Sequence, residues 1–574
     1  MVLANRGPQQ LMRRISPLSL ASIALIALGL GASATSLSND YAQDDRPIIE
    51  QNQAIHSLTT PWRFFTESYW PEPYDPALYR PLASLGYALQ WTAGRGSPEV
   101  FRIVSVTLLI LTGLAVFRLG RRFLPVPIAW LSAALFLVHP VHVEAVAAGV
   151  NQSELIVGLL GTLLVAVYLG HRDQTGDARW YLPRLFAMYL TALLFKESAA
   201  VLLGMVIAAE LILVRDSAPL KDRLTRMRPT VLGLLLGVAV FIAVRTGALG
   251  GRLLGTFVAE AFEGLSVGQR ALTMLGVVPH WFRLLLWPAH LRADYSPREI
   301  DPALAWGAAQ TLGAILLVAV PVVIWYCWRR APVVAFGLAW TAIALFPVSN
   351  VLVPTGVVLA ERTLFLPSIG VVLAVGGGLA VLWDSLRATR ATRAAILAAG
   401  TAGLALGAAR SVSRYAVWQS NDTYWRQAVI DSPRSYRAAH AYAQILFAAG
   451  NRAGGEREFR RAVALYPKAW GIYFAHANQL KRAGMCSDAV IFYDRTLIVE
   501  PGALAARTGM IACLLHDARY REAAAAAREG ARIADRPGFV RLFGRFGAVA
   551  DSASAAAAPV GSVRINIRAI DTLP

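Results

Sequence analysis

Hydrophobic segments recur along most of this chain, and short loops rich in arginine separate them. Between residues 18 and 410 charged side chains almost vanish from long stretches. Only 16% of the whole chain is charged, and its mean hydropathy is +0.48. Soluble domains are about a quarter charged, so the pattern indicates a chain whose solvent is lipid. The predicted fold class is all-α: a polytopic membrane domain of about eleven transmembrane helices, followed by a short helical solenoid.

The loops between these segments predict the topology. The candidate spans are 18–35, 100–117, 126–142, 153–170, 184–196, 198–214, 230–246, 303–328, 332–347, 364–385 and 394–410. Basic clusters favour the cytoplasmic side of a membrane protein, and this preference explains most of the net charge of +19. Binding of nucleic acid is therefore not needed to explain the charge. The clusters share one side only if the run 271–291, which contains Pro279, His280 and Arg283, is re-entrant or interfacial rather than a span.

This count predicts a multi-pass protein of the cell (inner) membrane with residues 1–17 in the cytoplasm. The loop 36–98, called the exported loop below, then lies on the extracytoplasmic (periplasmic) side together with the C-terminal domain. The exported loop is acidic and aromatic, unlike the basic loops, so we expect it to lie against the outer leaflet. One alternative remains for the first run: it ends in small residues, as a cleaved signal peptide does.

A 34-residue period governs the C-terminal region. Pro433, Pro467 and Pro501 keep this step, as do Leu446, Leu480 and Leu514. Thirty-four residues is the period of tetratricopeptide repeats (TPR), which stack helix pairs and leave a concave surface that holds peptide. The prediction is a TPR domain over 411–545, before an Ala- and Ser-rich, disordered tail over 546–574. A structural cap or a dimerisation module is the alternative role.

Polar residues gather at the span ends that this topology places outside. The Asp44-Asp45 pair lies in the exported loop, where one carboxylate could act as a base and the other could orient it. The other candidate site residues are Arg80, His139, His142, Glu144, Glu154, Lys196, Glu197, Asp294, Glu361 and Arg362. Any one of these residues could merely anchor a helix end or form an ion pair. Because they gather on one face of the membrane, a catalytic or binding role is favoured.

Metal binding is not predicted. His139 and His142 have a His-x-x-His spacing, but Pro140 between them breaks the helical geometry that such a pair needs. The three cysteines, Cys327, Cys486 and Cys513, show no metal-ligand spacing, and their positions allow no disulfide to be inferred.

Several segments together resemble a known family. They are 44–49 (DDRPII), 79–82 (YRPL), 139–146 (HPVHVEAV), 195–197 (FKE), 286–288 (LWP) with 293–296 (ADYS), and 360–368 (AERTLFLPS). In this order, with the repeats behind them, they resemble the transmembrane and TPR-containing O-mannosyltransferases and their bacterial relatives, within the GT-C glycosyltransferases. The chain departs from the pattern at Gln43, in the segment before Glu154, which lacks an expected arginine, and in its short repeat array.

The resemblance implies a GT-C-type membrane domain over 18–410 and an inverting transferase. Its donor would be a sugar, most simply mannose, on a polyprenyl phosphate, and its acceptor a hydroxyl of protein Ser or Thr outside the membrane. Asp44 is our preferred base and Asp45 its partner, with the reverse assignment left open. Arg80, Lys196 and Arg362 would hold the phosphate, helped by His139 or His142. No cofactor is firmly implied, and a divalent metal, on which GT-C enzymes differ, is possible but not predicted.

Other functions remain open at this stage. The acceptor could be an envelope glycan or lipid, with the repeats binding a partner protein. A non-catalytic membrane-anchored TPR scaffold would need only one or two spans. A transporter would place charge near mid-bilayer, where Glu210 is the main candidate.

Overall fold

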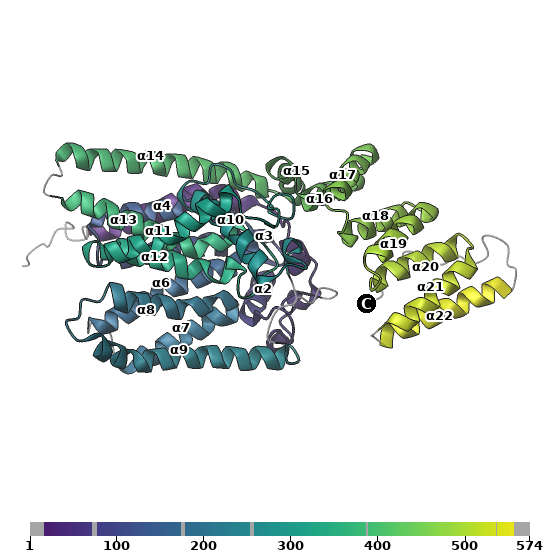
Figure 1. Ribbon diagram of the computed structural model, residues 1–574, viewed down its shortest axis with the longest axis horizontal. Helices are drawn as coiled ribbons and strands as arrows, with labels where there is room; N and C mark the ends of the chain where they lie inside the picture. The colour runs from purple at the N-terminus through teal and green to yellow at the C-terminus, as the bar shows by residue number, and fades with distance from the viewer. Residues whose placement is uncertain are drawn as a thin grey trace, which may run out of the picture. The chain divides into compact units, whose positions relative to one another are not determined.

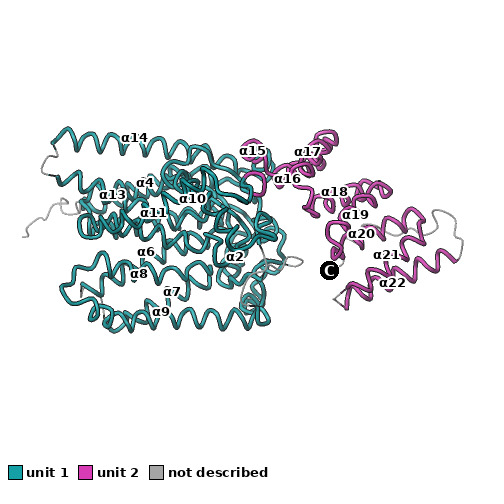
Figure 2. Tube along the Cα trace, viewed as in Figure 1, with its two compact units in different colours: residues 1–295, 300–427 teal, residues 296–299, 428–574 magenta. Residues whose placement is uncertain are grey.

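The computed structural model describes residues 16–71, 77–173, 178–252, 258–385, 389–534 and 537–555. Helix is the regular structure of these residues, and none of them forms a strand (Figure 1). The chain divides into two compact units (Figure 2). Unit 1 holds residues 1–295 and 300–427, and unit 2 holds residues 296–299 and 428–574. The predicted cytoplasmic segment 1–17 lies almost wholly outside the described residues.

Unit 1 is a bundle of apolar helices. They are α1 (Pro17–Ser33), α2 (Pro81–Gly94), α3 (Pro98–Gly120), α4 (Val126–Leu137), α5 (Val143–Ala147), α6 (Gln152–Arg172), α7 (Tyr181–Phe195), α8 (Leu202–Ile212), α9 (Leu220–Ala248), α10 (Val267–Leu286), α11 (Ala308–Arg330), α12 (Pro332–Leu345), α13 (Phe365–Asp384) and α14 (Arg390–Tyr415). The helix α15 (Asn421–Asp431) follows.

The chain is a multi-pass membrane protein by the length and composition of these helices. Seven described helices, namely α1, α3, α6, α9, α11, α13 and α14, are long and apolar enough to cross a bilayer. The helix α4 and the segment 140–147 form an eighth candidate, bent by 43°. The remaining predicted spans correspond to α7, α8 and α12, which have 15, 11 and 14 residues. The predicted count of eleven therefore depends on these three short helices crossing as well.

The run 271–291 forms most of α10, which is not among the seven long apolar helices. A capping box at Ser266 and Gln269 starts this helix, and Trp287, just before Pro288, ends it. One face packs inward through Val277, Trp281 and neighbouring residues. Its amphipathic character fits the predicted interfacial or re-entrant placement, which stays a prediction.

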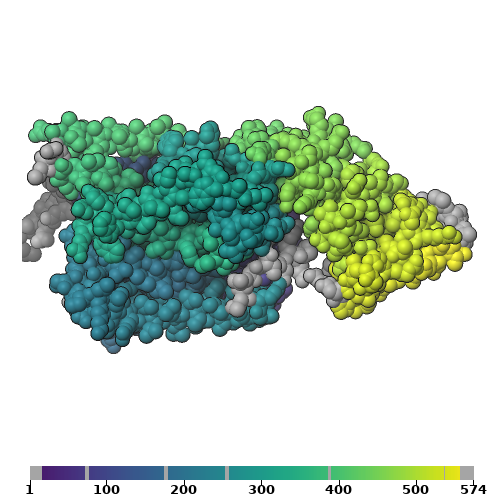
Figure 3. Space-filling view, in the orientation of Figure 1, coloured from purple at the N-terminus to yellow at the C-terminus, as the bar shows by residue number. Residues whose placement is uncertain are grey.

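Small residues let the helices of unit 1 approach closely. A Cβ added to Gly337 of α12 would lie 2.4 Å from the carbonyl oxygen of Gly370 in α13, so the two backbones touch there. Beside this contact the buried indole of Trp340 donates a 2.8 Å hydrogen bond to the carbonyl of Leu366. By contrast α11 presents apolar side chains outward, with Val318 64% and Trp325 76% exposed, as a lipid-facing helix does. The teal part of the chain, which includes α11, forms part of the surface seen in Figure 3.

The buried carboxylate of Glu210 joins three helices of unit 1. The Tyr168 hydroxyl donates to it at 2.6 Å, and the guanidinium groups of Arg172 and Arg223 donate at 3.0 Å each. A buried carboxylate with three such donors is stabilised by them. This arrangement fits a fixed brace between α6, α8 and α9, rather than the coupling group that a transporter would need.

The exported loop folds onto the ends of the spans. Its helical turns are η1 (Ala34–Ser38), η2 (Arg46–Glu50), η3 (Gln53–His56) and η4 (Pro61–Phe65), followed by α2. Phe64, Tyr69 and Tyr79 are buried, whereas Trp62 is 64% exposed. His56 stacks on Trp91 with ring centroids 3.7 Å apart. Three of the aromatic residues expected at the outer leaflet therefore pack inside the protein.

Unit 2 contains helix pairs that keep the 34-residue step. The pairs are α16 (Tyr436–Ala448) with α17 (Arg452–Leu465), α18 (Trp470–Arg482) with α19 (Cys486–Val499), and α20 (Leu504–His516) with α21 (Tyr520–Ile533). The turn within each pair has a residue of positive φ at the same register, Gly450, Gly484 and Ala518. The regular pairing is what the sequence period predicts, and the assignment as TPR stays a prediction.

One further helix, α22 (Pro537–Ala555), closes the described part of unit 2. The disordered tail was expected from residue 546, but the helix continues to Ala555 because Gly547, Ala550 and Ala553 are buried on its inner face. Phe543 packs at Gly530 of α21, where an added Cβ would lie 2.8 Å from its ring. Residues 556–574 lie outside the described residues.

Candidate functional site

Asp45 is a buried anchor. The backbone of Gln43 has a φ of +53°, and the turn that follows carries Asp45 into the protein, where it is 0% exposed. Its Oδ2 accepts hydrogen bonds from Arg102 Nη2 at 2.9 Å and from the backbone N–H of Gly149 at 3.0 Å, and its Oδ1 accepts from Val150 N–H at 2.9 Å. Asp45 thus ties the exported loop to α3 and to the start of α6.

Asp44 has a different environment, although it is the neighbouring residue. Its side chain is half-buried, and its backbone carbonyl accepts a hydrogen bond from the N–H of Ile48. Its charge acts on Arg362, on the buried Tyr424 and on Tyr69. Asp44 is therefore the member of the acidic pair that faces the cluster of predicted site residues.

Two of the predicted cations pair with predicted acids. The Arg80 guanidinium donates to Glu197 through Nε at 3.0 Å and Nη2 at 2.7 Å, and the Lys196 ammonium donates to Glu154 at 2.6 Å. Burial alone would raise the pKa of Glu197, but the bonded Arg80 and the charge of Lys196 lower it to about 2.

The third predicted cation, Arg362, pairs with Glu144. Its Nη1 donates to Glu144 Oε1, and its backbone N–H donates to Oε2 at 2.9 Å. The carboxylates of Asp44 and Glu154 also act on Arg362. Asn151 donates to the Glu144 carbonyl at 2.9 Å, which fixes the turn between α5 and α6. Arg362 is therefore the cation that connects the exported loop with the ends of two helices.

Acids and tyrosines complete the cluster. Glu361 accepts hydrogen bonds from the backbone N–H of Arg292 at 2.5 Å and from the Tyr295 hydroxyl at 2.9 Å. Burial, followed by the charges of Glu144, Asp294 and Asp44, raises the pKa of the Tyr424 hydroxyl well above its usual value. Asp294 is half-buried and belongs to the same electrostatic cluster.

The two histidines face protein groups. His139 Nε2 lies 3.1 Å from the Leu285 carbonyl, and its Nδ1 accepts from the N–H of Val141. His142 Nε2 lies 2.8 Å from the Ser368 hydroxyl. Among the described residues, three or more metal-type ligands gather only outside this cluster. The His-x-x-His pair therefore packs the bend between α4 and α5.

Two residues of the cluster, Arg102 and Tyr424, were not predicted from the sequence. Arg102, 1% exposed within the span α3, holds Asp45, and a charge inside an apolar run is a signal that it needs a buried carboxylate partner. The sequence around Tyr424 contains no comparable signal of a buried site residue, because the residues from 411 onward were predicted to belong to the repeat domain. In the structure it lies in unit 1, and its hydroxyl donates to the Ala293 carbonyl at 3.2 Å.

The arrangement has the parts for transfer of a group that carries an anion. Half-buried carboxylates and three cations fixed by acids lie together at the ends of the apolar helices. Carboxylates at such a place can accept a proton, and guanidinium and ammonium groups can balance a phosphate. Fixed partners also hold the cations in place before any ligand arrives, which lowers the reorganisation needed during a reaction.

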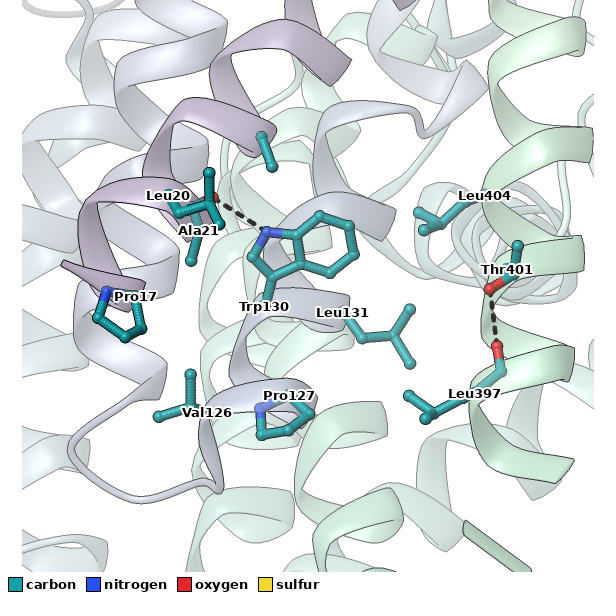
Figure 4. Close-up of a pocket in the computed structure, with 11 residues that line it drawn as sticks. Pro17, Leu20, Ala21, Val126, Pro127, Trp130, Leu131, Leu397, Thr401 and Leu404 are labelled. Atoms are coloured by element: carbon teal, nitrogen blue, oxygen red, sulfur yellow. Dashed lines mark hydrogen bonds between the residues drawn. The ribbon is translucent and has the colours of Figure 1, made fainter. Parts of the chain in front are cut away.

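A separate apolar groove of about 380 Å³ lies between α1, α4 and α14 (Figure 4). It is lined by Pro17, Leu20, Ala21, Ala24, Val126, Pro127, Trp130, Leu131, Leu397, Thr401 and Leu404. The Trp130 indole donates to the Ala21 carbonyl at 3.1 Å, so its ring forms a fixed wall. Its lining suits hydrocarbon, and it contains none of the predicted site residues.

Comparison with known proteins gives relatives that are named protein O-mannosyl-transferases. No family model matches the chain. It is 24% identical to mouse "Protein O-mannosyl-transferase TMTC3" over 60% of this chain and 40% of the relative, and 23% identical to fruit-fly "Protein O-mannosyl-transferase Tmtc1" over 78% and 62%. It is 25% identical to human "Protein O-mannosyl-transferase TMTC1" over 81% and 57%. The chain thus spans less than two thirds of the length of these relatives.

The names of these relatives agree with the family that the motifs in the sequence resemble. The chain is a multi-pass membrane protein that is similar to the TMTC protein O-mannosyl-transferases.

Proposed function

We propose that this protein is a glycosyltransferase that moves a sugar, most simply mannose, from a polyprenyl-phosphate carrier to a hydroxyl acceptor. The acceptor would be a protein Ser or Thr on the extracytoplasmic side, presented by the repeat region. The names of the relatives support transfer of mannose to protein. The observation that carries the proposal is the placement of Asp44, half-buried and within electrostatic reach of Arg362 and Tyr424.

The proposed chemistry is a single displacement. The acceptor oxygen attacks the anomeric carbon and loses its proton to the Asp44 carboxylate, while the bond from that carbon to the phosphate oxygen breaks and the electron pair leaves with the phosphate. One such displacement inverts the configuration. A phosphate is a good leaving group, so the protein has to balance its charge rather than protonate it.

The cations have separate roles in this scheme. Arg362, which interacts with Asp44, is the candidate for the phosphate closest to the base, and its planar guanidinium suits bidentate contact. Lys196 and Arg80 extend the positive charge along the cluster, each fixed by its carboxylate. Asp45 positions this assembly and is not the base, because protein donors already occupy both of its oxygens.

The test measures sugar transfer by the full chain in lipid nanodiscs supplied with polyprenyl-phosphate mannose and a Ser/Thr-rich acceptor peptide. Asp44→Asn is expected to lower the rate by a factor of at least ~100, the range lost with a general base, without altering the thermal midpoint. Glu50→Gln is the matched control from the same loop, because Glu50 forms an ion pair with Arg46, four residues earlier, at 39% side-chain exposure. Wild-type transfer by Asp44→Asn would refute the assignment of the base.

Glycoproteomics of cells that lack the protein decides the acceptor. Loss of O-linked mannose from proteins is the expected result. Unchanged protein glycosylation beside an altered envelope glycan or lipid would keep the transferase and replace its acceptor.

A further inference from the structure

Two cysteines of unit 2 meet, although 27 positions separate them in the sequence. Cys486 is the first residue of α19, and Cys513 lies near the end of α20. Their Sγ atoms are 2.6 Å apart, and the residues are 2% and 0% exposed. The contact joins the second helix of one pair to the first helix of the next pair. The described residues contain one other cysteine, Cys327 of α11 in unit 1.

The surroundings favour the thiolate at Cys486. A helix N-terminus stabilises negative charge, and Cys486 occupies the first helical position of α19. The contact with Cys513, followed by the charges of His516 and Lys481, lowers the pKa of Cys486. His516 is hydrogen-bonded to Asp517 at 3.0 Å, a contact that raises the pKa of the imidazole and so favours its cationic form. Cys486 therefore has the features of the attacking sulfur of an exchange reaction.

We propose that Cys486 and Cys513 form a disulfide that joins α19 to α20. The oxidant is a dithiol–disulfide protein or a small-molecule disulfide. The Cys486 thiolate attacks one sulfur of the donor disulfide, which breaks that bond and releases the first donor thiolate. Cys513 then loses its proton and attacks the Cys486 sulfur of the mixed disulfide, which releases the second donor thiolate. Two electrons pass to the donor, and the two protons lost by the cysteines complete its two thiols.

A metal site made from the same residues fits the geometry less well. Cys486, His516 and Asp517 offer ligand atoms that lie within 4.8 Å of one another. However, two thiolates on a tetrahedral zinc ion, each about 2.3 Å from the metal, lie about 3.8 Å apart. The contact between Cys486 and Cys513 is much shorter than that. It suits a sulfur–sulfur bond, and His516 then serves the thiolate rather than a metal.

The bond would fasten successive helix pairs together. It closes a loop that contains all of α19 and most of α20, so it restricts the unfolded chain as well as the folded one. It also requires an oxidising compartment, because cytosolic thiols are kept reduced. The proposal therefore depends on the predicted extracytoplasmic position of unit 2 and not on the transferase activity.

The test counts thiols in the full chain. Membranes are quenched in acid, denatured, and treated with N-ethylmaleimide before and after reduction. One alkylated cysteine before reduction, Cys327, and three afterwards are expected, together with a non-reduced peptide pair that contains Cys486 and Cys513. The Cys513→Ser variant should show two alkylated cysteines without reduction, and Cys327→Ser should show none.

Three alkylated cysteines without reduction would overturn the proposal, and so would a cross-link that involves Cys327. One zinc ion per purified chain, released by an organomercurial, would also overturn it in favour of the metal site. Sugar transfer by the Cys486→Ser variant is measured separately. Loss of the disulfide and loss of the transferase proposal are thus distinguishable.

Discussion

The backbone of Gln43 has a positive φ, in the left-handed region of conformational space. The side chains of Asp44 and Asp45, which follow this turn, lie in different environments. Asp45 is bound on both oxygens, and Arg102, 1% exposed, is its charge partner. Removing one member of a buried pair leaves an uncompensated charge, which typically costs 3–5 kcal/mol. We therefore expect Asp45→Asn to lower the free energy of unfolding by about 3 kcal/mol.

Unfolding in detergent, followed by tryptophan fluorescence, measures this loss. In the double variant with Arg102→Met, the loss should be smaller than the sum of the two single losses, because no charge is left unpaired. Additive losses would show that the two side chains do not act as a pair.

Ala518 provides a second test at the scale of one residue. It has a φ of +59° at the register where the other pairs have Gly450, at +77°, and Gly484, at +75°. A side chain in this region costs roughly 1 kcal/mol, so Ala518→Gly should raise the thermal midpoint of unit 2 in the full chain. Gly484→Ala is the matched opposite, because an added Cβ there meets no atom within 4 Å. Equal midpoints for both variants and wild type would contradict the strain.

At the scale of elements, the pair Arg80–Glu197 joins the start of α2 to the turn between α7 and α8. The native pKa of Glu197 is about 2, below the value of about 4.3 for an unperturbed glutamate. The unfolded chain then binds more protons in this interval, so the stabilisation is full above about pH 4.3 and disappears as the pH falls toward 2.

The expected result is a smaller fall of the thermal midpoint between pH 5 and pH 2.5 in Glu197→Gln than in wild type. Glu67→Gln is the control, since the pair of Glu67 with Arg63 is solvent-exposed and should leave the wild-type slope unchanged. If Glu197→Gln and wild type fell equally, the pair would not hold these elements together.

The elements that the sequence predicted are those whose pattern is local. Apolar runs in the sequence predicted each of the seven long apolar helices of the described residues. The 34-residue period predicted the helix pairs of unit 2 and the turns within them. The short helices α7, α8 and α12 are different, because the length of an apolar run does not decide whether such a helix crosses the membrane. The buried aromatic residues of the exported loop were assigned to the lipid surface, because composition does not distinguish a lipid contact from a protein contact.

The sequence predicted most of the residues that form the candidate site, but not which cation pairs with which acid. Topology placed the acids and cations at one end of the spans, and electrostatic interactions link most of them in the structure. Which cation meets which acid depends on helix rotation and packing, which a linear pattern does not encode. The roles of Asp45 and Cys486 likewise follow from contacts with Arg102 and Cys513, residues distant in the sequence.

At the scale of the whole molecule, three features require that the Asp44 cluster and unit 2 lie on the extracytoplasmic side of the membrane. The acceptor must meet the Asp44 cluster, the proposed disulfide needs an oxidising compartment, and the arginine-rich loops favour the cytoplasm. Because α7, α8 and α12 decide whether the number of crossings is odd or even, the orientation of unit 2 is a sensitive test of all three.

A pair of reporters can measure this orientation. Alkaline phosphatase, which is active only after export, is fused at the C-terminus and, in a second fusion, in the arginine-rich loop after α8. An odd number of crossings from a cytoplasmic N-terminus predicts activity at the C-terminus and none in the loop, and a cytosol-active fluorescent protein should give the reverse pattern. Phosphatase activity in the loop alone would place Asp44 and the repeats in the cytosol. There neither an extracytoplasmic acceptor nor a stable disulfide would be available, so both proposals would fail together.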